Sequence, residues 1–194
     1  MSVQDNYQFL EHVADTTQTN NFTFDNWQQL NSHTIISMAR KFLVNNSIAV
    51  RKIPLKTIYA FITDSGLESI PKQQQRWAIL FANAVTFDNP CNQHLTLVKI
   101  LRDASLEEVE ILHYLKKVSF IEYETSRIWI KTKGIEQWAH KALNCSGIDI
   151  EIILENLLMK RLVETSKSGE EIRIAPLGMH FILECETPYG LKHS

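Results

Sequence analysis

The sequence predicts a mainly α-helical protein, in which a helical N-terminal domain is followed by a winged-helix-like α+β domain with a small β-hairpin wing. Three observations support this fold class. Between residues 25 and 115, apolar residues recur at spacings of three and four, the period of an amphipathic helix. Around residue 129 the spacing shortens to two, which is typical of a strand. Residues 135–185 then follow the order helix, helix, strand, tight turn, strand and helix, and together with the preceding helix this is the plan of a winged helix.

Length and the change of period predict the domain organisation. A chain of 194 residues suits one larger domain or two small ones. We expect a polar, partly mobile segment over residues 1–25, a helical domain over residues 26–102, and the winged-helix-like domain over residues 103–194.

Composition and charge place the chain among ordinary globular proteins. It is 44% hydrophobic and 22% charged. Its formal charge of −2 creates no global field toward nucleic acid or anionic lipid. The first residues lack a charged segment followed by an apolar run, and no apolar run approaches the roughly 20 residues of a spanning helix. We therefore expect a cytoplasmic protein with no membrane partner, whose three cysteines are reduced thiols.

Four helices are expected in the N-terminal domain. The first begins near Asp25 and carries an apolar stripe as far as Leu43. The second follows Pro54, which suits a first helical turn because its missing N–H has no intrahelical partner there. Gly66 is expected to end this helix near the C′ position. Ser69 is expected to cap the third helix.

The third helix contains the segment "QQRWAILFANAV" and is expected to be the central packing element of this domain. Its apolar stripe predicts a buried face with little room for chemistry. Asn83 is expected to contact a neighbouring backbone, and a fourth helix is expected over residues 92–101. The stripe consists of Trp77, Leu80, Phe81, Ala84 and Val85.

The second domain begins with the sequence "SLEE", a capping box in which Ser105 caps the helix and Glu108 reaches back. Residues 120–134 alternate around Ile128 and Ile130, which indicates a short hairpin or edge strands, although a helical start near Ile121 is an alternative. The remaining expected elements are helices over 135–143 and 148–162, strands over 163–165 and 171–175 joined by a turn at 166–170, and a last helix from Pro176.

No pattern in the sequence indicates an enzyme, a cofactor or a metal. The glycines are scattered singly, which excludes a P-loop and a dinucleotide-binding loop, and no G-x-S-x-G motif is present. Cys91 and His94 supply two ligands where a structural zinc needs four, so we interpret them as a helix-start cysteine and a surface histidine. We expect no catalytic residue, no cofactor and no metal ion.

Nucleic-acid binding is a more specific alternative function, because a winged helix places one helix in the major groove and its wing on phosphates. The expected groove helix carries Asp149, Glu151 and Glu155, whose charge has the wrong sign for a phosphate backbone. A protein contact is therefore favoured over DNA. The basic residues that remain candidates for nucleic-acid contacts are Arg51, Lys52, Lys160, Arg161, Lys167 and Arg173.

The four tryptophans are expected to lie in the core, since each follows a periodic pattern. Trp129 is the exception, because it lies opposite Ile128 and Ile130 if that segment is a strand.

Several segments resemble the core of the Abi-alpha family, a bacterial domain named for abortive-infection proteins. They are "IPLKTIYAFITDSGLES", "QQRWAILFANAV" and "FDNPCNQHLTLVKILRDASLEEVEILHYL", and "IRIAPLGMHFILEC" resembles the C-terminal stretch of the family. Ala175 stands where the family usually has threonine. The resemblance covers about residues 48–185. It implies a bacterial origin, a cytosolic location and a part in defence against phage, and it assigns no site residue.

Three functional hypotheses follow. The first is a non-enzymatic phage-defence protein that acts through contacts with a protein partner of unknown identity. The second is a DNA-binding transcriptional regulator, in which a homodimer combines the wing with Arg40, Lys41, Arg51 and Lys52. The third is an enzyme whose site is assembled from scattered residues.

Overall fold

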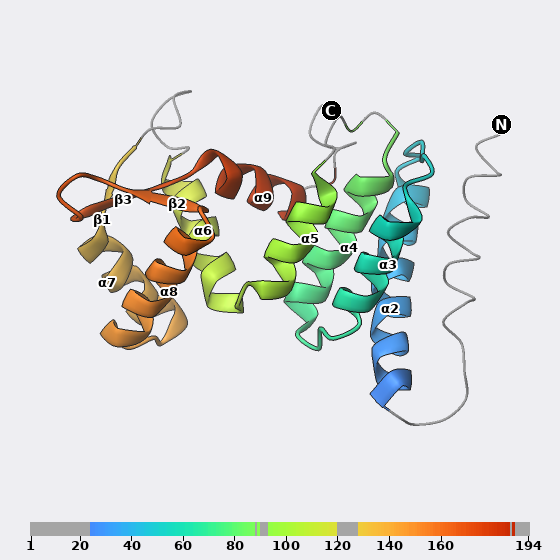
Figure 1. Cartoon of the computed structure of the whole chain (residues 1–194), viewed down its shortest axis with the longest axis horizontal. Helices are drawn as coiled ribbons and strands as arrows, with labels where there is room; N and C mark the ends of the chain where they lie inside the picture. The colour runs from blue at the N-terminus through green and yellow to red at the C-terminus, as the bar shows by residue number, and fades with distance from the viewer. Residues whose placement is uncertain (1–23, 88, 90–92, 120–127, 187, 189–194) are drawn as a thin grey trace. The chain divides into compact units, whose positions relative to one another are not determined.

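The computed structural model describes residues 24–87, 89, 93–119, 128–186 and 188. This part of the chain is mainly helical, with eight helices and one three-stranded antiparallel sheet (Figure 1). The chain divides into two compact units, Met1–Asp103 with Glu184–Ser194, and Ala104–Leu183. The expected second domain ran from residue 103 to the end. The structure instead assigns the chain from Glu184 onward to the first unit, where Asn83 donates a buried hydrogen bond of 2.9 Å to the Glu184 carbonyl.

The first unit is built around α4, which confirms that the "QQRWAILFANAV" segment is a packing element. All five residues of the expected stripe are buried, and Ala78 and Ala82 on the other sides of the helix are buried as well. The Phe61 ring meets Trp77 and Phe81 edge-on, with centroid distances of 6.1 and 5.1 Å. The helices of this unit are α2 (Phe24–Asn45), α3 (Leu55–Ser65), α4 (Pro71–Val85) and α5 (His94–Asp103).

Gly66 ends α3 as expected, whereas the cap expected for α4 is wrong. Gly66 follows α3 with a φ of −63°, which is right-handed, so left-handed freedom does not explain the glycine. The reason is space, because a Cβ at this position would lie 2.6 Å from the Gln28 carbonyl oxygen and 2.6 Å from Ser32 Oγ. Ser69 does not cap α4. Ile70 is the N-cap residue, and its backbone N–H is bound by the Glu68 carboxylate at 2.8 Å.

Side chains of α2 donate hydrogen bonds to backbone carbonyls at the C-terminal end of α3 and to the carbonyl of Gly66. Gln28 donates to the Thr63 carbonyl at 2.9 Å, Ser32 to the Ile62 carbonyl at 2.6 Å, and Asn31 to the Gly66 carbonyl at 3.1 Å. These bonds explain why α2 must approach the end of α3 so closely that only glycine fits at position 66.

The second unit combines helices with the small sheet, whose strand order is β1–β3–β2. The pairing is antiparallel throughout, with Ile130 opposite Ile172 and Val163 opposite Ile174. The elements are α6 (Leu106–Ser119), β1 (Ile130–Lys131), α7 (Thr132–Leu143), α8 (Gly147–Met159), β2 (Val163–Thr165), β3 (Glu171–Ile174) and α9 (Pro176–Glu186), of which the last three residues belong to the first unit.

Most of the elements expected in this unit are confirmed. The capping box is present, since Ser105 Oγ accepts from the Glu108 N–H at 3.1 Å and the Glu108 carboxylate accepts from the Ser105 N–H at 2.9 Å. Ile130 lies in an edge strand as expected, whereas residues 120–127 of the expected hairpin lie outside the described residues.

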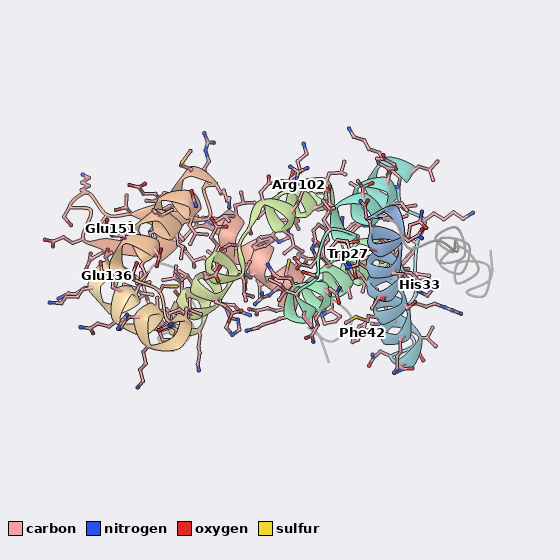
Figure 2. The ribbon with its side chains drawn as sticks, turned by 90° about the horizontal axis from the view of Figure 1, so that it is seen from below. Trp27, His33, Phe42, Arg102, Glu136 and Glu151 are labelled. Carbon is pink, nitrogen blue, oxygen red and sulfur yellow. The ribbon has the colours of Figure 1, made fainter. Side chains whose placement is uncertain are left out.

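The expectation that every tryptophan outside the strand segment is buried is wrong for Trp27. This side chain is 38% exposed on α2 (Figure 2). Trp138 is half-buried and stacks on Tyr114 at a centroid distance of 4.3 Å. Only Trp77 is a full core residue among these three.

Candidate functional site

The α7–α8 pair presents the most distinctive surface of the second unit, and local chemistry fixes where α8 begins. Asn144 ends α7 in the left-handed conformation (φ 57°, ψ 31°), which asparagine tolerates well. Ser146 and Asp149 then form a second capping box, in which the Ser146 N–H donates to the Asp149 carboxylate at 2.9 Å. The hydrogen bonds from Ser146 hold the pKa of Asp149 below its ordinary value. Asp149 therefore serves the helix start.

The inner face of α8 packs into the core of the unit. Ile150, Ile153, Leu154 and Leu157 are buried there. The C-terminal end of the helix is held by Lys160, whose Nζ lies 2.6 Å from the Glu108 carboxylate. That carboxylate is almost fully buried and also serves the capping box of α6, so a single group joins two helix ends.

The outer face of α8 is apolar and acidic. Ile148, Ile152 and Met159 are 71%, 52% and 82% exposed, which is unusual for large aliphatic side chains that recur on one helix face. Glu151 and Glu155 are exposed between them, and Figure 2 labels Glu151 on this helix. We call this set of five residues the acidic stripe. It occupies the side of α8 opposite the buried residues.

The basic residues considered for nucleic-acid contacts have different environments. Four belong to the second unit, whereas Arg51 and Lys52 belong to the first. Lys160 is paired with Glu108, and Arg173 is paired with Glu164, with its Nε 2.7 Å from that carboxylate.

Arg161 and Lys167 are exposed. Arg161 follows α8 in the left-handed conformation, with a φ of 58°. Lys167 lies in the turn between β2 and β3. Two of the four candidates in the second unit therefore have a carboxylate partner, and the remaining two lie outside the exposed face of α8.

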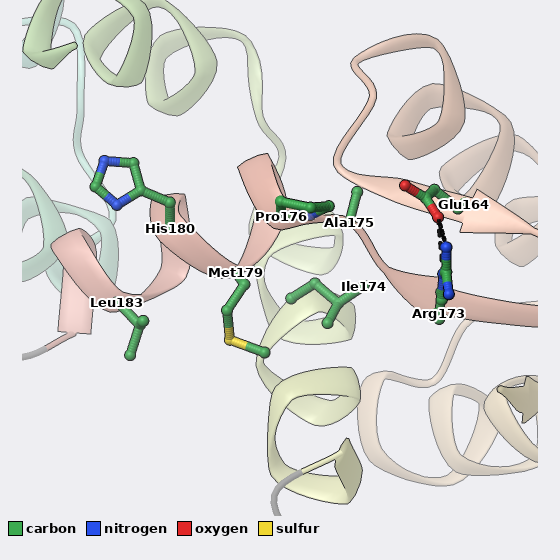
Figure 3. A pocket seen from close by; sticks show the side chains of 8 residues that line it. All are labelled: Glu164, Arg173, Ile174, Ala175, Pro176, Met179, His180 and Leu183. Carbon is green, nitrogen blue, oxygen red and sulfur yellow. Dashed lines mark hydrogen bonds and ion pairs between the residues drawn. The ribbon is translucent and has the colours of Figure 1, made fainter. Parts of the chain in front are cut away.

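A cavity of about 400 Å³ lies beside β3 and the first turns of α9 (Figure 3). Its wall is mostly apolar, and the Glu164–Arg173 pair lies at one end. The Arg173 guanidinium also covers the Trp129 ring at 4.6 Å from its centroid. A carboxylate already compensates this guanidinium, and the other basic group of the wall is His180. The apolar side chains of the wall include Ile174, Pro176, Met179 and Leu183.

A second cavity of about 290 Å³ lies in the first unit between α2 and α4. Met38, Phe42, Ala78 and Ile79 line it, and its polar groups are Gln75 and Glu186. A single carboxylate beside an amide does not form a general acid–base pair.

The described residues contain no cluster of three or more histidine, cysteine or acidic side chains that could hold a metal ion. His94 is buried at the start of α5, so the interpretation of this residue as a surface histidine is wrong, and Cys91 lies outside the described residues. Burial raises the pKa of the Cys145 thiol, which keeps it protonated and weakly nucleophilic at neutral pH.

The sequence contained a signal for the acidic stripe that the charge-based argument overlooked. Residues 148, 152 and 159 recur at helical spacing on the side opposite the buried residues 150, 153, 154 and 157. A helix that is apolar on two opposite faces is stabilised when both faces are packed against other surfaces.

Comparisons with known proteins return no match: no family model, no curated protein and no solved structure resembles the chain sufficiently. No helix among the described residues is long and apolar enough to cross a membrane.

Proposed function

We propose that this protein is a non-enzymatic bacterial protein that acts through a protein contact made by the acidic stripe of α8. The observation that carries this proposal is the exposure of Ile148, Ile152 and Met159 beside two glutamates. Exposed aliphatic side chains that share one face favour burial against an apolar partner surface. Glu151 and Glu155 oppose approach to a phosphate backbone at the same place.

We interpret the second unit as a winged helix used for protein recognition. The order α6, β1, α7, α8, β2, β3 supports this interpretation, as does the three-residue connection between α7 and α8. In DNA-binding members of this fold class, the helix in the position of α8 enters the major groove. Here its outer face has the chemistry of a protein-binding surface.

We further propose a role in phage defence in the bacterial cytoplasm. The support is the resemblance of the segments around Ile53, Trp77 and His94 to Abi-alpha proteins. This part of the proposal does not specify which protein the acidic stripe binds.

The main alternative is a DNA-binding regulator that acts as a dimer. Its support is the exposure of Arg161 and Lys167 at the two ends of β2. These two side chains could contact phosphates even though Lys160 and Arg173 are paired with carboxylates.

Phage plating on bacteria that express the chain tests the proposal. The stripe variant is Ile148→Ser with Ile152→Ser, and its matched control is Leu30→Ser, which removes an exposed leucine from α2. We expect the wild type and the control to reduce plaque formation, and the stripe variant to lose this protection while keeping its melting temperature. A basic-residue variant, Arg161→Gly with Lys167→Ala, should protect like the wild type.

Two outcomes would contradict the proposal. Loss of protection in the basic-residue variant alone, with salt-dependent binding of a mixed-sequence DNA duplex by the wild type, would favour the regulator. Equal plaque counts with and without the wild-type chain would remove the defence role.

A further inference from the structure

A second helix exposes a stripe whose chemistry complements that of α8. On α3, Leu55 and Tyr59 are 79% and 72% exposed, and they recur four residues apart on one face. Lys56 lies beside them, and Lys52 precedes the helix at a spacing of three from Leu55. All four side chains are exposed, and we call them the basic stripe.

The residues of the basic stripe do not contribute to the core of the first unit. The opposite face of α3 packs through Ile58 and Phe61, and Phe61 joins the Trp77 cluster. Within the described residues, neither Lys52 nor Lys56 is paired with a carboxylate. The stripe therefore combines two large apolar side chains with two cations that have no structural task in the described part of the chain.

The two stripes complement each other in composition. In the acidic stripe, Glu151, Ile152 and Glu155 follow each other at spacings of one and three. In the basic stripe, Lys56 follows Leu55 within α3, whereas Lys52 lies in the non-helical segment that precedes the helix. Each stripe therefore flanks an apolar side chain with two like charges. Two helices packed along these faces would bury apolar surface and form carboxylate–ammonium pairs at its edges.

We propose that the acidic stripe of one copy docks on the basic stripe of a second copy of this chain. This inference rests on the proposed function, since it names the occupant of the same surface of α8. The two stripes are different surfaces, so the contact is heterologous. It either closes into a ring of two or more copies or extends into a chain.

The exposed apolar face of α2, also in the first unit, is a poorer match. On α2, Trp27, Leu30, Met38 and Val44 are exposed, but Lys41 is the only charged residue among the exposed positions of that helix in the described range. One cation cannot balance Glu151 and Glu155. Electrostatic complementarity therefore selects α3.

Light scattering of the chromatographed protein over a range of concentrations is the test. A contact through two helix faces is small, so we expect association that depends on protein concentration and weakens as salt rises. Reversing the acidic stripe with Glu151→Lys and Glu155→Lys, or the basic stripe with Lys52→Glu and Lys56→Glu, should weaken association about tenfold or more.

Charge rescue makes the test specific. A chain that carries all four reversals should associate like the wild type. A mixture of the two double variants should form assemblies of unlike copies, because both stripes are positive in one variant and negative in the other. Residues outside the stripes provide controls with the same change of charge, Glu136→Lys with Glu170→Lys and Lys41→Glu with Lys99→Glu, and these should associate like the wild type. Glu136 is half-buried, and the other three are exposed.

A monomer at every concentration and salt would overturn the inference. So would association that the stripe reversals leave unchanged, or that the controls disturb equally. None of these results decides the plating experiment, in which the stripe variant is compared with Leu30→Ser for phage protection. A monomeric protein whose protection still depends on Ile148 and Ile152 would keep the proposed function and reassign the stripe to a different protein.

Discussion

Helices α4 and α8 each contain eight alanine, aliphatic, methionine or aromatic residues but have different surroundings. In α4, apolar residues on nearly every side are buried, including Trp77, Phe81 and Ala82. In α8, the residues on one face are buried, while Ile148 and Met159 on the other are largely exposed. Apolar content alone therefore does not separate a central packing element from a helix that retains a surface for a partner.

The helix ends show the same contrast. No side chain caps the start of α4, which begins with Pro71 after the N-cap residue Ile70. The start of α8 has a reciprocal capping box between Ser146 and Asp149. A helix surrounded by core is held by its packing, whereas a helix with one exposed face depends more on its ends.

The largest expected effect is in the core of α4. Trp77→Ala should lower the free energy of unfolding by about 3–5 kcal/mol, because it removes a fully buried ring that meets Phe61. Chemical denaturation followed by circular dichroism measures the change. The matched substitution on α8 is Ile152→Ala, which should change stability by less than about 0.5 kcal/mol because the side chain is half exposed. Similar losses for both variants would mean that the outer face of α8 is buried in the free protein.

The next largest effect is expected where α9 packs against Leu162, in the segment that follows α8. The Leu162 carbonyl accepts a hydrogen bond from the Ala175 N–H at 2.9 Å, and Gly178 packs directly against the same peptide group. A Cβ on Gly178 would lie 2.9 Å from the Leu162 carbonyl carbon and closer still to its oxygen, so α9 would have to move away. We expect Gly178→Ala to destabilise the protein by about 3 kcal/mol, measured by the same denaturation. As a control, Gly134→Ala should have a small effect because nothing lies within 4 Å of the added Cβ.

Sequence patterns predicted the parts of the fold that depend on short-range chemistry. The stripe of α4 and the Ser105–Glu108 capping box depend on residues within a few positions of each other, and both are confirmed. The contact between Asn83 and a neighbouring backbone was also expected. Its partner, the Glu184 carbonyl, lies 101 residues away and could not be named in advance.

Features that depend on contacts between segments far apart in the sequence were missed or wrongly explained. Gly66 has the pattern of a left-handed helix end, but it is required because α2 passes too close for a side chain. The Lys160–Glu108 pair joins residues 52 positions apart, and nothing local to either residue indicates it. For the candidate surface, counting charges identified the two glutamates of α8. The exposed Ile148 and Ile152 became significant only when the buried face of the helix was known.

A smaller, stabilising effect is expected at the end of α8. Arg161 adopts a φ of 58° while its N–H donates to the Leu158 carbonyl and the next N–H donates to Leu157, which is the pattern of a glycine-type helix end. Arg161→Gly should raise the free energy of unfolding by about 0.5–1 kcal/mol, since glycine adopts this conformation without strain from a Cβ. Thermal unfolding would detect the gain. A loss of stability would indicate that the arginine side chain makes a contact worth more than the strain.

The smallest effect is the pH dependence of the start of α8. The hydrogen bonds of Ser146 lower the pKa of Asp149 in the folded protein below its ordinary value of 3.8. A group with a depressed folded pKa stabilises the protein above its unfolded pKa, and this contribution is lost as the pH falls. Hydrogen exchange of the first-turn amides of α8 should therefore accelerate below about pH 4, relative to the intrinsic rate. In Asp149→Asn this additional acceleration should disappear. The first-turn amides of α6 serve as an internal reference, because the Ser105–Glu108 capping box is present in both proteins. Acceleration that persists unchanged in Asp149→Asn would assign the acid sensitivity to another carboxyl group.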